Sequence, residues 1–284
     1  HLYLCHARTQ DGDEWDCSTR GFFTRALEDL HAETGLQFMA AFEHEFLITG
    51  DTLAPAPAFT VEAMRAIAPL AADIARSLRE AGLEPETVEP EYGVGQYEVT
   101  VAPGLGVVAG DRAVLTREVI REAARRRGMR ASFSPKPHPD GVGNGSHVHF
   151  SLVDDEGRNV THDPAHPSGV SVIAQSFIAG VMRHMPALCA LVAPSPVSYL
   201  RLGPHHWSCG FASFGIQNRE AAIRVCPSTD PDPVVQARTF NLEFRPPDPS
   251  ASPYMVLGAL VRAGLAGSGI TCRCPLPASA ILPT

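Results

Sequence analysis

The chain has 284 residues, a formal net charge of -8 and no basic tract. This length allows one large domain or two small ones, and the charge argues against nucleic acid as the main partner. The sequence has no run of about 20 uninterrupted apolar residues and its start lacks the pattern of a signal peptide, so we expect a cytoplasmic protein with no membrane partner.

Apolar residues recur at helical spacing in several segments. In chain order these are 21–34, followed by Gly35 as a stop signal, and then 60–81, 110–127, 171–193 and 252–267. Pro69 lies within the second segment and must bend or break that helix, because proline lacks the N–H that a helix interior requires.

Strand candidates lie between the helices. They are 37–48, 86–101, 129–134, 146–153, 198–202, 221–226 and 240–245. Helices and strands do not alternate regularly, and the chain contains neither a G-x-G-x-x-G sequence nor a P-loop. This favours an α+β fold around a mostly antiparallel sheet over a doubly wound fold.

Four of the strand candidates carry polar or charged side chains on one face and bulky apolar ones on the other, because residues i and i+2 of a strand share a face. One such strand would be ordinary amphipathicity with a solvated outer face. Four strands with almost no lysine instead indicate a concave site. The polar sets are Glu43 and Glu45; Gln96, Glu98 and Thr100; His147, His149 and Ser151; and Asn241, Glu243 and Arg245.

Carboxylates dominate the candidate site. Without counter-ions they would repel one another and several would take up protons. Oxygen ligands with a little imidazole suit Mg²⁺ or Mn²⁺, and arginines beside metal-holding acids are what phosphoryl transfer requires. The acidic and imidazole set is Glu43, Glu45, Glu91, Glu98, Glu243 and His147, and the arginines are Arg201, Arg219, Arg224 and Arg245.

The seven cysteines show no C-x-x-C spacing and their number is odd. Free thiols in a reducing compartment are therefore expected. The C-x-C pair Cys272 and Cys274 is compatible with a disulfide or a metal site, but that spacing alone is a weak signal.

Motifs of one protein family occur in order along the chain. They are 43-EHE-45, 91-EYGVGQYE-98, 134-SPKP-137, 143-GNGSHVH-149, 198-SYLRL-202, 218-NREAAIR-224 and 243-EFRPPDPSASPY-254. In this order they resemble the catalytic domain of the glutamine synthetase superfamily, and we assign residues 1–284 to such a domain. The resemblance implies a curved antiparallel sheet in the form of a half-barrel, ATP entering from one side and glutamate from the other, and a homo-oligomer of stacked rings.

The resemblance also implies roles for individual residues. One metal near the substrate amino acid would be held by Glu45, Glu91 and Glu98, and a second at the nucleotide phosphates by Glu43, His147 and Glu243. Further implied contacts are His149 and Ser151 with the nucleotide, Gly143, Arg201 and Arg245 with glutamate, and Arg219 and Arg224 with the transferring phosphate. The implied reaction forms γ-glutamyl phosphate from glutamate and ATP, and an amine then displaces the phosphate.

The segment 201-RLGPHHWSCG-210 departs from the family. Trp207 stands where ammonia-using members carry a catalytic glutamate, and tryptophan cannot accept a proton. A large flat ring suits an organic amine through apolar and cation–π contacts. His205 or His206 is the candidate replacement base, and we include His206 with Trp207, Arg219 and Arg224 in the expected catalytic set. The alternative is that these histidines merely line a loop.

Further departures are Asn241 and Gln217, which stand at positions where the family usually has arginine. Nothing in the chain resembles the family's small N-terminal β-rich domain. We expect an ATP-dependent ligase that joins glutamate to a small amine other than ammonia. The alternatives are an ordinary glutamine synthetase with a divergent loop, a catalytically idle homologue that binds nucleotide or an amino acid, and another phosphoryl transfer such as guanidino phosphorylation.

Overall fold

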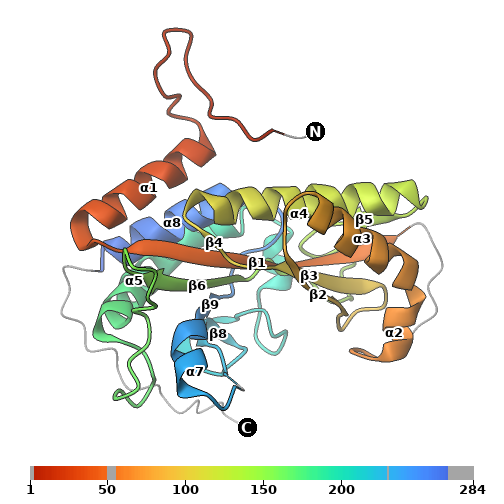
Figure 1. Ribbon diagram of the computed structural model, residues 1–284. Helices are drawn as coiled ribbons and strands as arrows, with labels where there is room; N and C mark the ends of the chain where they lie inside the picture. The colour runs from red at the N-terminus through yellow and green to blue at the C-terminus, as the bar shows by residue number, and fades with distance from the viewer. Residues whose placement is uncertain (1–2, 50–55, 229, 268–284) are drawn as a thin grey trace.

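The structure is a computed structural model that describes residues 3–49, 56–228 and 230–267. Figure 1 shows the arrangement of its helices and strands. In chain order these are α1 (Thr19–Thr34), β1 (Gln37–Thr49), α2 (Val61–Ala66), α3 (Ala68–Glu80), β2 (Pro85–Pro90), β3 (Gln96–Val101), β4 (Gly104–Leu105), α4 (Val107–Arg126), β5 (Arg130–Ser132), β6 (Val148–Val153), α5 (Val172–Val192), α6 (Ser198–Arg201), β7 (Phe211–Ile216), β8 (Ala221–Val225), α7 (Pro233–Thr239), β9 (Leu242–Phe244) and α8 (Pro253–Leu265).

The sheet is open and mostly antiparallel, as the sequence predicts. Its strand order is β2-β3-β1-β6-β9-β8-β7, and β4 and β5 both pair with β1. The pair β7–β8 is parallel and the other pairs are antiparallel. The long strand β1 is therefore central, with four different strands along its two edges.

Local signals set the helix boundaries. The side chain of Ser18 accepts a hydrogen bond from the N–H of Gly21 at the start of α1, and Gly35 ends that helix with a left-handed backbone at φ 69°, which glycine adopts without a Cβ penalty. The predicted helix 60–81 is broken at Ile67 into α2 and α3. Pro69 lies in the first turn of α3, where a missing N–H costs nothing.

Two strand predictions are wrong in detail. The segment 198–202 is the short helix α6 rather than a strand, because a brief apolar run does not distinguish the two conformations. The segment 86–101 is two strands, β2 and β3. The turn between them includes Gly95 at φ 74° and a hydrogen bond from the N–H of Gln96 to the carbonyl of Gly93.

Alternate residues of β1 face the two sides of the sheet. Phe38, Ala40, Phe42 and Phe46 are buried beneath the helices that cover one face (Figure 1). The odd-numbered residues, including Glu43, point to the opposite face. This alternation separates a hydrophobic core on one side from polar side chains on the other.

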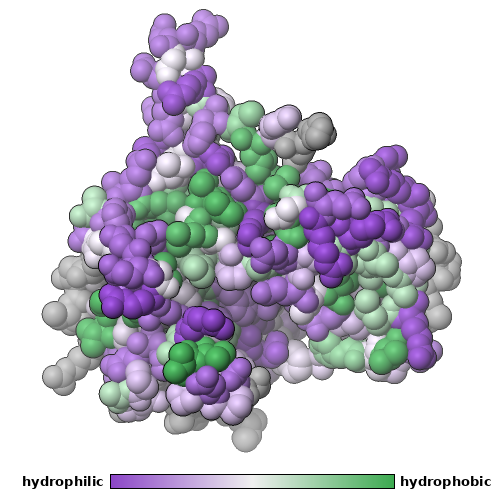
Figure 2. Space-filling model, in the orientation of Figure 1, coloured by the Kyte–Doolittle hydropathy of each residue, from purple (hydrophilic) through white to green (hydrophobic). Residues whose placement is uncertain are grey.

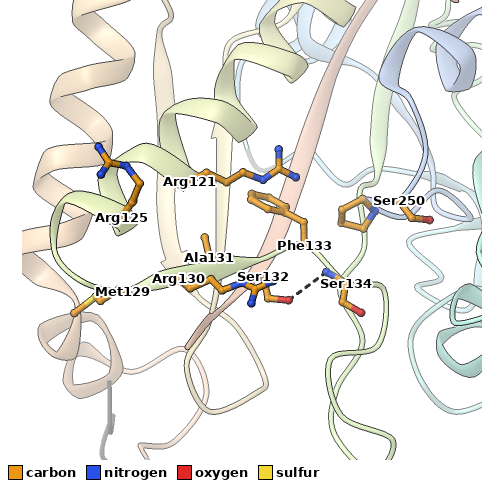
Figure 3. A pocket seen from close by; sticks show the side chains of 10 residues that line it. Arg121, Arg125, Met129, Arg130, Ala131, Ser132, Phe133, Ser134 and Ser250 are labelled. Atoms are coloured by element: carbon orange, nitrogen blue, oxygen red, sulfur yellow. Dashed lines mark hydrogen bonds between the residues drawn. The ribbon is translucent and has the colours of Figure 1, made fainter. Parts of the chain in front are cut away.

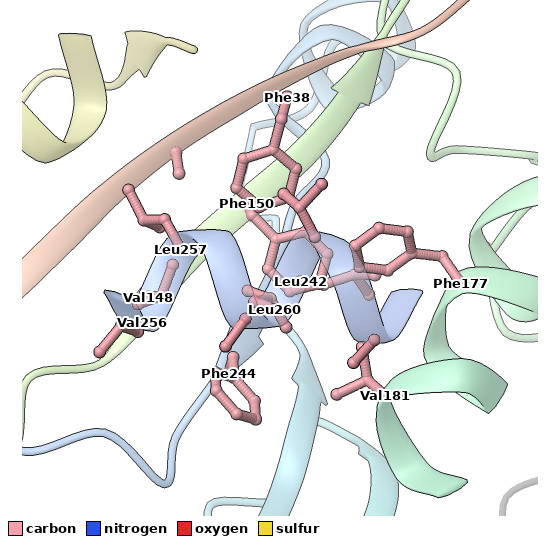
Figure 4. Close-up of a cluster of buried hydrophobic side chains, with 14 of the residues drawn as sticks. Phe38, Val148, Phe150, Phe177, Val181, Leu242, Phe244, Val256, Leu257 and Leu260 are labelled. Carbon is pink, nitrogen blue, oxygen red and sulfur yellow. The ribbon is translucent and has the colours of Figure 1, made fainter. Parts of the chain in front are cut away.

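The larger core lies between the sheet and helices α1, α5 and α8. Figure 4 shows its centre, where Phe38 stacks on Phe150 with ring centroids 5.5 Å apart and Phe177 of α5 lies against both. Helices α5 and α8 approach closely at Gly264, where a Cβ would lie 2.1 Å from the ring of Phe177. Helix α5 is long and apolar enough by composition to cross a membrane, and one side of it packs in this core, with Phe177, Ile178 and Val181 buried.

The surface is mixed in character. Figure 2 shows a largely hydrophilic N-terminal arm, and hydrophobic residues gathered where α1, α8 and the beginning of α4 meet.

Five cysteines of the described part of the chain are free thiols, namely Cys5, Cys17, Cys189, Cys209 and Cys226. Cys272 and Cys274 lie outside the described residues.

Candidate active site

The polar face of the sheet brings together residues from five adjacent strands or their ends. Glu45 of β1 is paired in register with Glu98 of β3. On the other side of β1, His149 of β6 is paired with Glu243 of β9, and Arg224 of β8 is paired with the same glutamate. Side chains separated by up to 200 positions in the sequence, such as Glu43 and Glu243, therefore become neighbours on one surface.

His147 lies at the centre of this group. Its Nδ1 is 2.9 Å from Oε2 of Glu43 and 3.4 Å from Oε1 of Glu243. Its Nε2 lies 3.2 Å from Nη2 of Arg201, which is always a donor, so Nε2 accepts and Nδ1 carries the proton. Burial and the charge of Arg245 lower the pKa of His147, which favours the neutral imidazole that binds metals.

Glu43 and His149 form a partly buried ion pair. Nε2 of His149 lies 2.8 Å from Oε1 of Glu43. Burial opposes both charges, but the charge of His149 and the hydrogen bonds from His147 and His149 outweigh it and hold the pKa of Glu43 well below its usual range. Burial likewise disfavours a charged His149, yet Glu43 raises its pKa well above the ordinary value.

The acids on the other side of the group have no such compensation. Burial and the charges of neighbouring carboxylates raise the pKa of Glu91 to about 8. The same two causes raise the pKa of Glu98 well above its usual range. Ligand atoms of Glu43, Glu98 and His147 lie within 4.8 Å of one another. Excess negative charge on closely spaced oxygen ligands fits divalent cations, which would neutralise it.

Gln96 and the loop 143–145 fix the position of Glu45. The N–H of Gly145 donates to Oε2 of Glu45 at 2.8 Å, and Nε2 of Gln96 lies 3.2 Å from the same oxygen and 2.8 Å from the carbonyl of Gly143. A Cβ at Gly145 would lie 2.6 Å from Nε2 of His147. Glycine is therefore required here for the loop to approach the acids.

Two of the four predicted arginines pair with Glu243, and a third contacts the backbone beside it. Arg224 and Arg245 each form an ion pair with its carboxylate, and Arg201 donates to the carbonyl of Arg245 at 3.2 Å. The interactions with His147, Arg245 and His149 outweigh burial and lower the pKa of Glu243. Arg219 is exposed in the turn before β8, so the structure does not bring it against this group.

The loop 203–210 passes beside Arg245. The carbonyl of Trp207 accepts from Nη2 of Arg245 at 2.7 Å, and its N–H donates to Oε1 of Glu220 at 3.0 Å. Trp207 is half exposed, and the side chains of His205 and His206 are exposed as well. Trp207 is thus tied to the site through its backbone, and its ring is available to solvent.

Nucleotide-side residues predicted from the motifs also lie near one another. Nδ1 of His149 lies 2.8 Å from Oδ1 of Asn241 and 3.5 Å from Sγ of Cys226, and the hydroxyl of Ser151 donates to the carbonyl of Phe240 at 2.8 Å. Asn241 therefore takes part in the site as a partner of His149. Cys226 carries no signal in the sequence that places it here.

A second hollow lies away from the acids. Figure 3 shows this pocket of about 850 Å³ between α4, β5 and the segment that contains Ser250. Arg121, Arg125 and Arg130 line it, but Arg121 and Arg125 are already paired with Glu118 and Glu122 of the same helix. None of the predicted site residues lines this hollow, so it is separate from the candidate active site.

Comparison with known proteins identifies the family to which the chain is similar. The family described as "Glutamine synthetase, catalytic domain" matches residues 16–280. A gamma-glutamylpolyamine synthetase of Streptomyces coelicolor is 38% identical over 277 residues, which cover 95% of this chain and 58% of that protein. A glutamate–isopropylamine ligase of Pseudomonas sp. is 28% identical, with 93% and 59% of the two chains covered. A glutamine synthetase of Pyrococcus furiosus is 32% identical, with 91% and 58% covered.

A solved structure is also similar. The crystal structure of a glutamine synthase homolog superimposes with a TM-score of 0.86 at 43% identity, over 92% of this chain and 62% of the other. The present chain thus spans about 58% of the length of the curated relatives it matches.

Proposed function

Because this chain belongs to the glutamine synthetase catalytic-domain family, we propose that it carries the active site of an ATP-dependent ligase that joins glutamate to an organic amine. The observation that carries the proposal is the group of carboxylates with uncompensated charge, Glu91 and Glu98 above all, beside arginines held on Glu243. Such a group is suited to phosphoryl transfer from a nucleotide.

The residues present fit two divalent cations. Glu45, Glu91 and Glu98 would hold one, and Glu43, His147 and Glu243 the other. Bound Mg²⁺ or Mn²⁺ would supply charge neutralisation at the phosphate oxygens of ATP. The raised pKa values of Glu91 and Glu98 support this assignment, since a carboxylate group that resists ionisation alone ionises readily beside a cation.

The chain's own residues would perform the remaining tasks of the first step. Arg201, Arg245 and the backbone near Gly143 would orient glutamate so that its γ-carboxylate faces the terminal phosphate of ATP. Arg219 and Arg224 would bind the transferring phosphoryl group, whose equatorial oxygens carry the developing charge. His149 and Ser151 would contact the nucleotide. The products of this step are ADP and γ-glutamyl phosphate.

In the second step a neutral amine attacks the γ-carbonyl and inorganic phosphate leaves. The attacking nitrogen must then lose a proton, and His206 or His205 would accept it. Trp207 is half exposed, and its ring would provide an aromatic surface for the acceptor, which favours an amine with carbon substituents over ammonia. The printed names of two relatives also refer to organic amines, one a polyamine and the other isopropylamine.

We further propose that the protein acts in the cytoplasm, where ATP and glutamate are supplied, and that it assembles as a homo-oligomer, as expected from the family's stacked rings.

The alternative function is ordinary glutamine synthesis from ammonia, which the name of the Pyrococcus relative represents. A group of acids of the same kind would serve both reactions, and the two reactions differ in the amine that accepts the glutamyl group.

The test is phosphate release by the full-length protein with ATP, glutamate and Mg²⁺ or Mn²⁺ across a panel of amines that includes ammonia. We expect release with an organic amine and at least tenfold less with ammonia at equal concentration. Release with ammonia alone would establish the alternative. No release with any amine, despite measurable ATP binding, would indicate a catalytically idle homologue.

A further inference from the structure

Three aromatic residues form a continuous wall beside the candidate active site. The ring of Tyr92 meets the ring of Trp207 edge to face, with centroids 5.0 Å apart and an interplanar angle of 89°. Tyr92 also meets Phe59, with centroids 5.5 Å apart at 83°. Phe59, Tyr92 and Trp207 are 55%, 51% and 50% exposed. Large aromatic side chains that gather on a surface in this way commonly mark a binding site.

The wall joins two parts of the site. Tyr92 directly follows Glu91 and lies in the turn between β2 and β3. Trp207 lies in the loop that Arg245 and Glu220 hold through backbone hydrogen bonds of 2.7 and 3.0 Å. The aromatic surface therefore extends from a metal-ligand candidate to an arginine assigned to glutamate, and an acceptor that reacts there would contact it.

Two residues of the wall have strained backbone conformations, which indicates that the surrounding structure holds the wall in a defined position. Trp207 has φ 51° and Phe59 has φ 57°, values that are rare for bulky residues because Cβ approaches the following carbonyl. At Trp207, hydrogen bonds to a carboxylate and a guanidinium offset this cost. Strained conformations that are held by charged partners are typical of functional sites.

On the basis of the proposed function, we propose that Phe59, Tyr92 and Trp207 form the subsite for the distal ammonium group of a diamine or polyamine acceptor, with Glu220 as the positioning residue for Trp207. The nitrogen that attacks the γ-carbonyl must be neutral. A second nitrogen of the same acceptor keeps its positive charge, and the π faces of aromatic rings attract such a group. A monoamine has no charge left to place there.

A carboxylate beside the wall favours the same class of acceptor. Oε1 of Glu220 accepts from the N–H of Trp207 at 3.0 Å, and its Oε2 is buried and has no hydrogen-bond partner among the described residues. Glu220 does not belong to the proposed metal-ligand sets, so a cationic group of the acceptor would offset its negative charge.

The test compares 1,4-diaminobutane with n-butylamine, two acceptors of equal chain length, in phosphate release by the full-length protein. In Tyr92→Leu we expect the KM for the diamine to rise about 5- to 30-fold, the range of a cation–π contact, and the KM for n-butylamine to change less than about twofold. Trp207→Leu should raise the KM for the diamine at least about threefold more than the KM for n-butylamine. Trp15→Leu is the matched control, because Trp15 is also 50% exposed and lies in the N-terminal segment. Equal changes for both acceptors, or none, would overturn the proposal.

Two variants separate positioning by Glu220 from its charge. Glu220→Gln keeps an acceptor for the N–H of Trp207, so the KM for n-butylamine should stay near the wild-type value while the KM for the diamine rises about threefold. Glu220→Ala removes the acceptor and should raise both KM values. If Gln and Ala behaved alike, Glu220 would not position Trp207.

Failure of the proposed function would be recognised separately. If no amine supported phosphate release, calorimetric titration of the full-length protein with 1,4-diaminobutane would decide about the subsite. Binding that Trp207→Leu weakens at least about fivefold would support it, and absence of binding would overturn it. A change of assembly mass in the aromatic variants with both KM values unchanged would instead identify the wall as a contact between subunits, and the proposal would be wrong.

Discussion

Glu45 and Glu98 are paired in register on β1 and β3, and both carboxylates are almost fully buried, with 9% and 5% of each residue exposed. Burial and the neighbouring charges raise the pKa of Glu98 above the value of an unfolded chain. The folded state therefore binds the proton of Glu98 more tightly than the unfolded state does. This group's contribution to the stability of the fold falls as the pH rises above about 4.5, the ordinary pKa of a glutamate side chain.

Replacement of Glu98 by glutamine should therefore stabilise the metal-free protein at neutral pH. We expect Tm to rise on the order of 2–4 °C at pH 7 and to be unchanged near pH 4, where the carboxylate is protonated in both states. Thermal unfolding with and without Mg²⁺ checks this, and the increase of Tm on adding Mg²⁺ should be lost in the variant. The exposed Glu33 provides the control Glu33→Gln, and a variant at Glu98 that is less stable at pH 7 would contradict the prediction.

Divalent-cation binding should depend on pH through Glu91, whose pKa is raised to about 8. Below this pH the cation must displace a proton, so the apparent affinity should rise by up to about tenfold per pH unit from pH 6 to 8 and level off above. Calorimetry in buffers with different ionisation enthalpies would count the protons released. Glu91→Gln should flatten the dependence, and an affinity independent of pH in the wild-type protein would exclude this carboxylate as a ligand.

Gly145→Ala should disturb the acids without removing any of them. The added Cβ would lie 2.6 Å from Nε2 of His147 and 3.0 Å from Oε1 of Glu45. The loop must then move away and lose the hydrogen bond from its N–H to Glu45. We expect at least a tenfold loss of cation affinity and of phosphate release, with Tm lowered by only a few degrees. Wild-type cation affinity in a folded variant would show that the loop tolerates the shift.

Trp207→Glu should alter the choice of acceptor. A carboxylate at this position can accept a proton from ammonium and removes the aromatic surface. We expect the ratio of kcat/KM for ammonia to that for the preferred organic amine to rise at least tenfold. Trp207→Gln is the matched variant, since it removes the ring without adding a base. Equal loss with both acceptors would show that Trp207 does not select the amine.

Much of the sheet and its polar face could be predicted from the sequence. The alternation of Glu43 and Glu45 with apolar neighbours in β1 is strong because one face of the strand packs on helices. The strand β7 was not predicted, since Phe211–Ile216 combines small residues with apolar ones and shows no clear period. The helix α6 was predicted as a strand because four residues are too few for a helical period to appear.

The site was predictable where a pattern or motif repeats and unpredictable where a contact depends on loop geometry. The motif places Glu91, which precedes a turn, in the candidate site, and its pKa is raised by burial and by the neighbouring carboxylates Glu45, Glu89 and Glu43. Glu220 and Tyr92 were not identified, because their contacts with Trp207 depend on left-handed backbone at Trp207 and on a turn after β2. No spacing in the sequence encodes such a contact.

The central position of β1 has a consequence for local opening of the chain. Its amides and carbonyls are paired with β3, β4, β5 and β6, so a fluctuation that frees β1 must separate most of the sheet. Amide protons of residues 38–48 should accordingly exchange with deuterated solvent only through global unfolding, whereas those of the loop 203–210 should exchange through local opening. Glu43 and Glu45 of the candidate site thus lie on the segment expected to open last. The ring of Trp207, which we propose to face the acceptor, lies on a loop expected to open among the first.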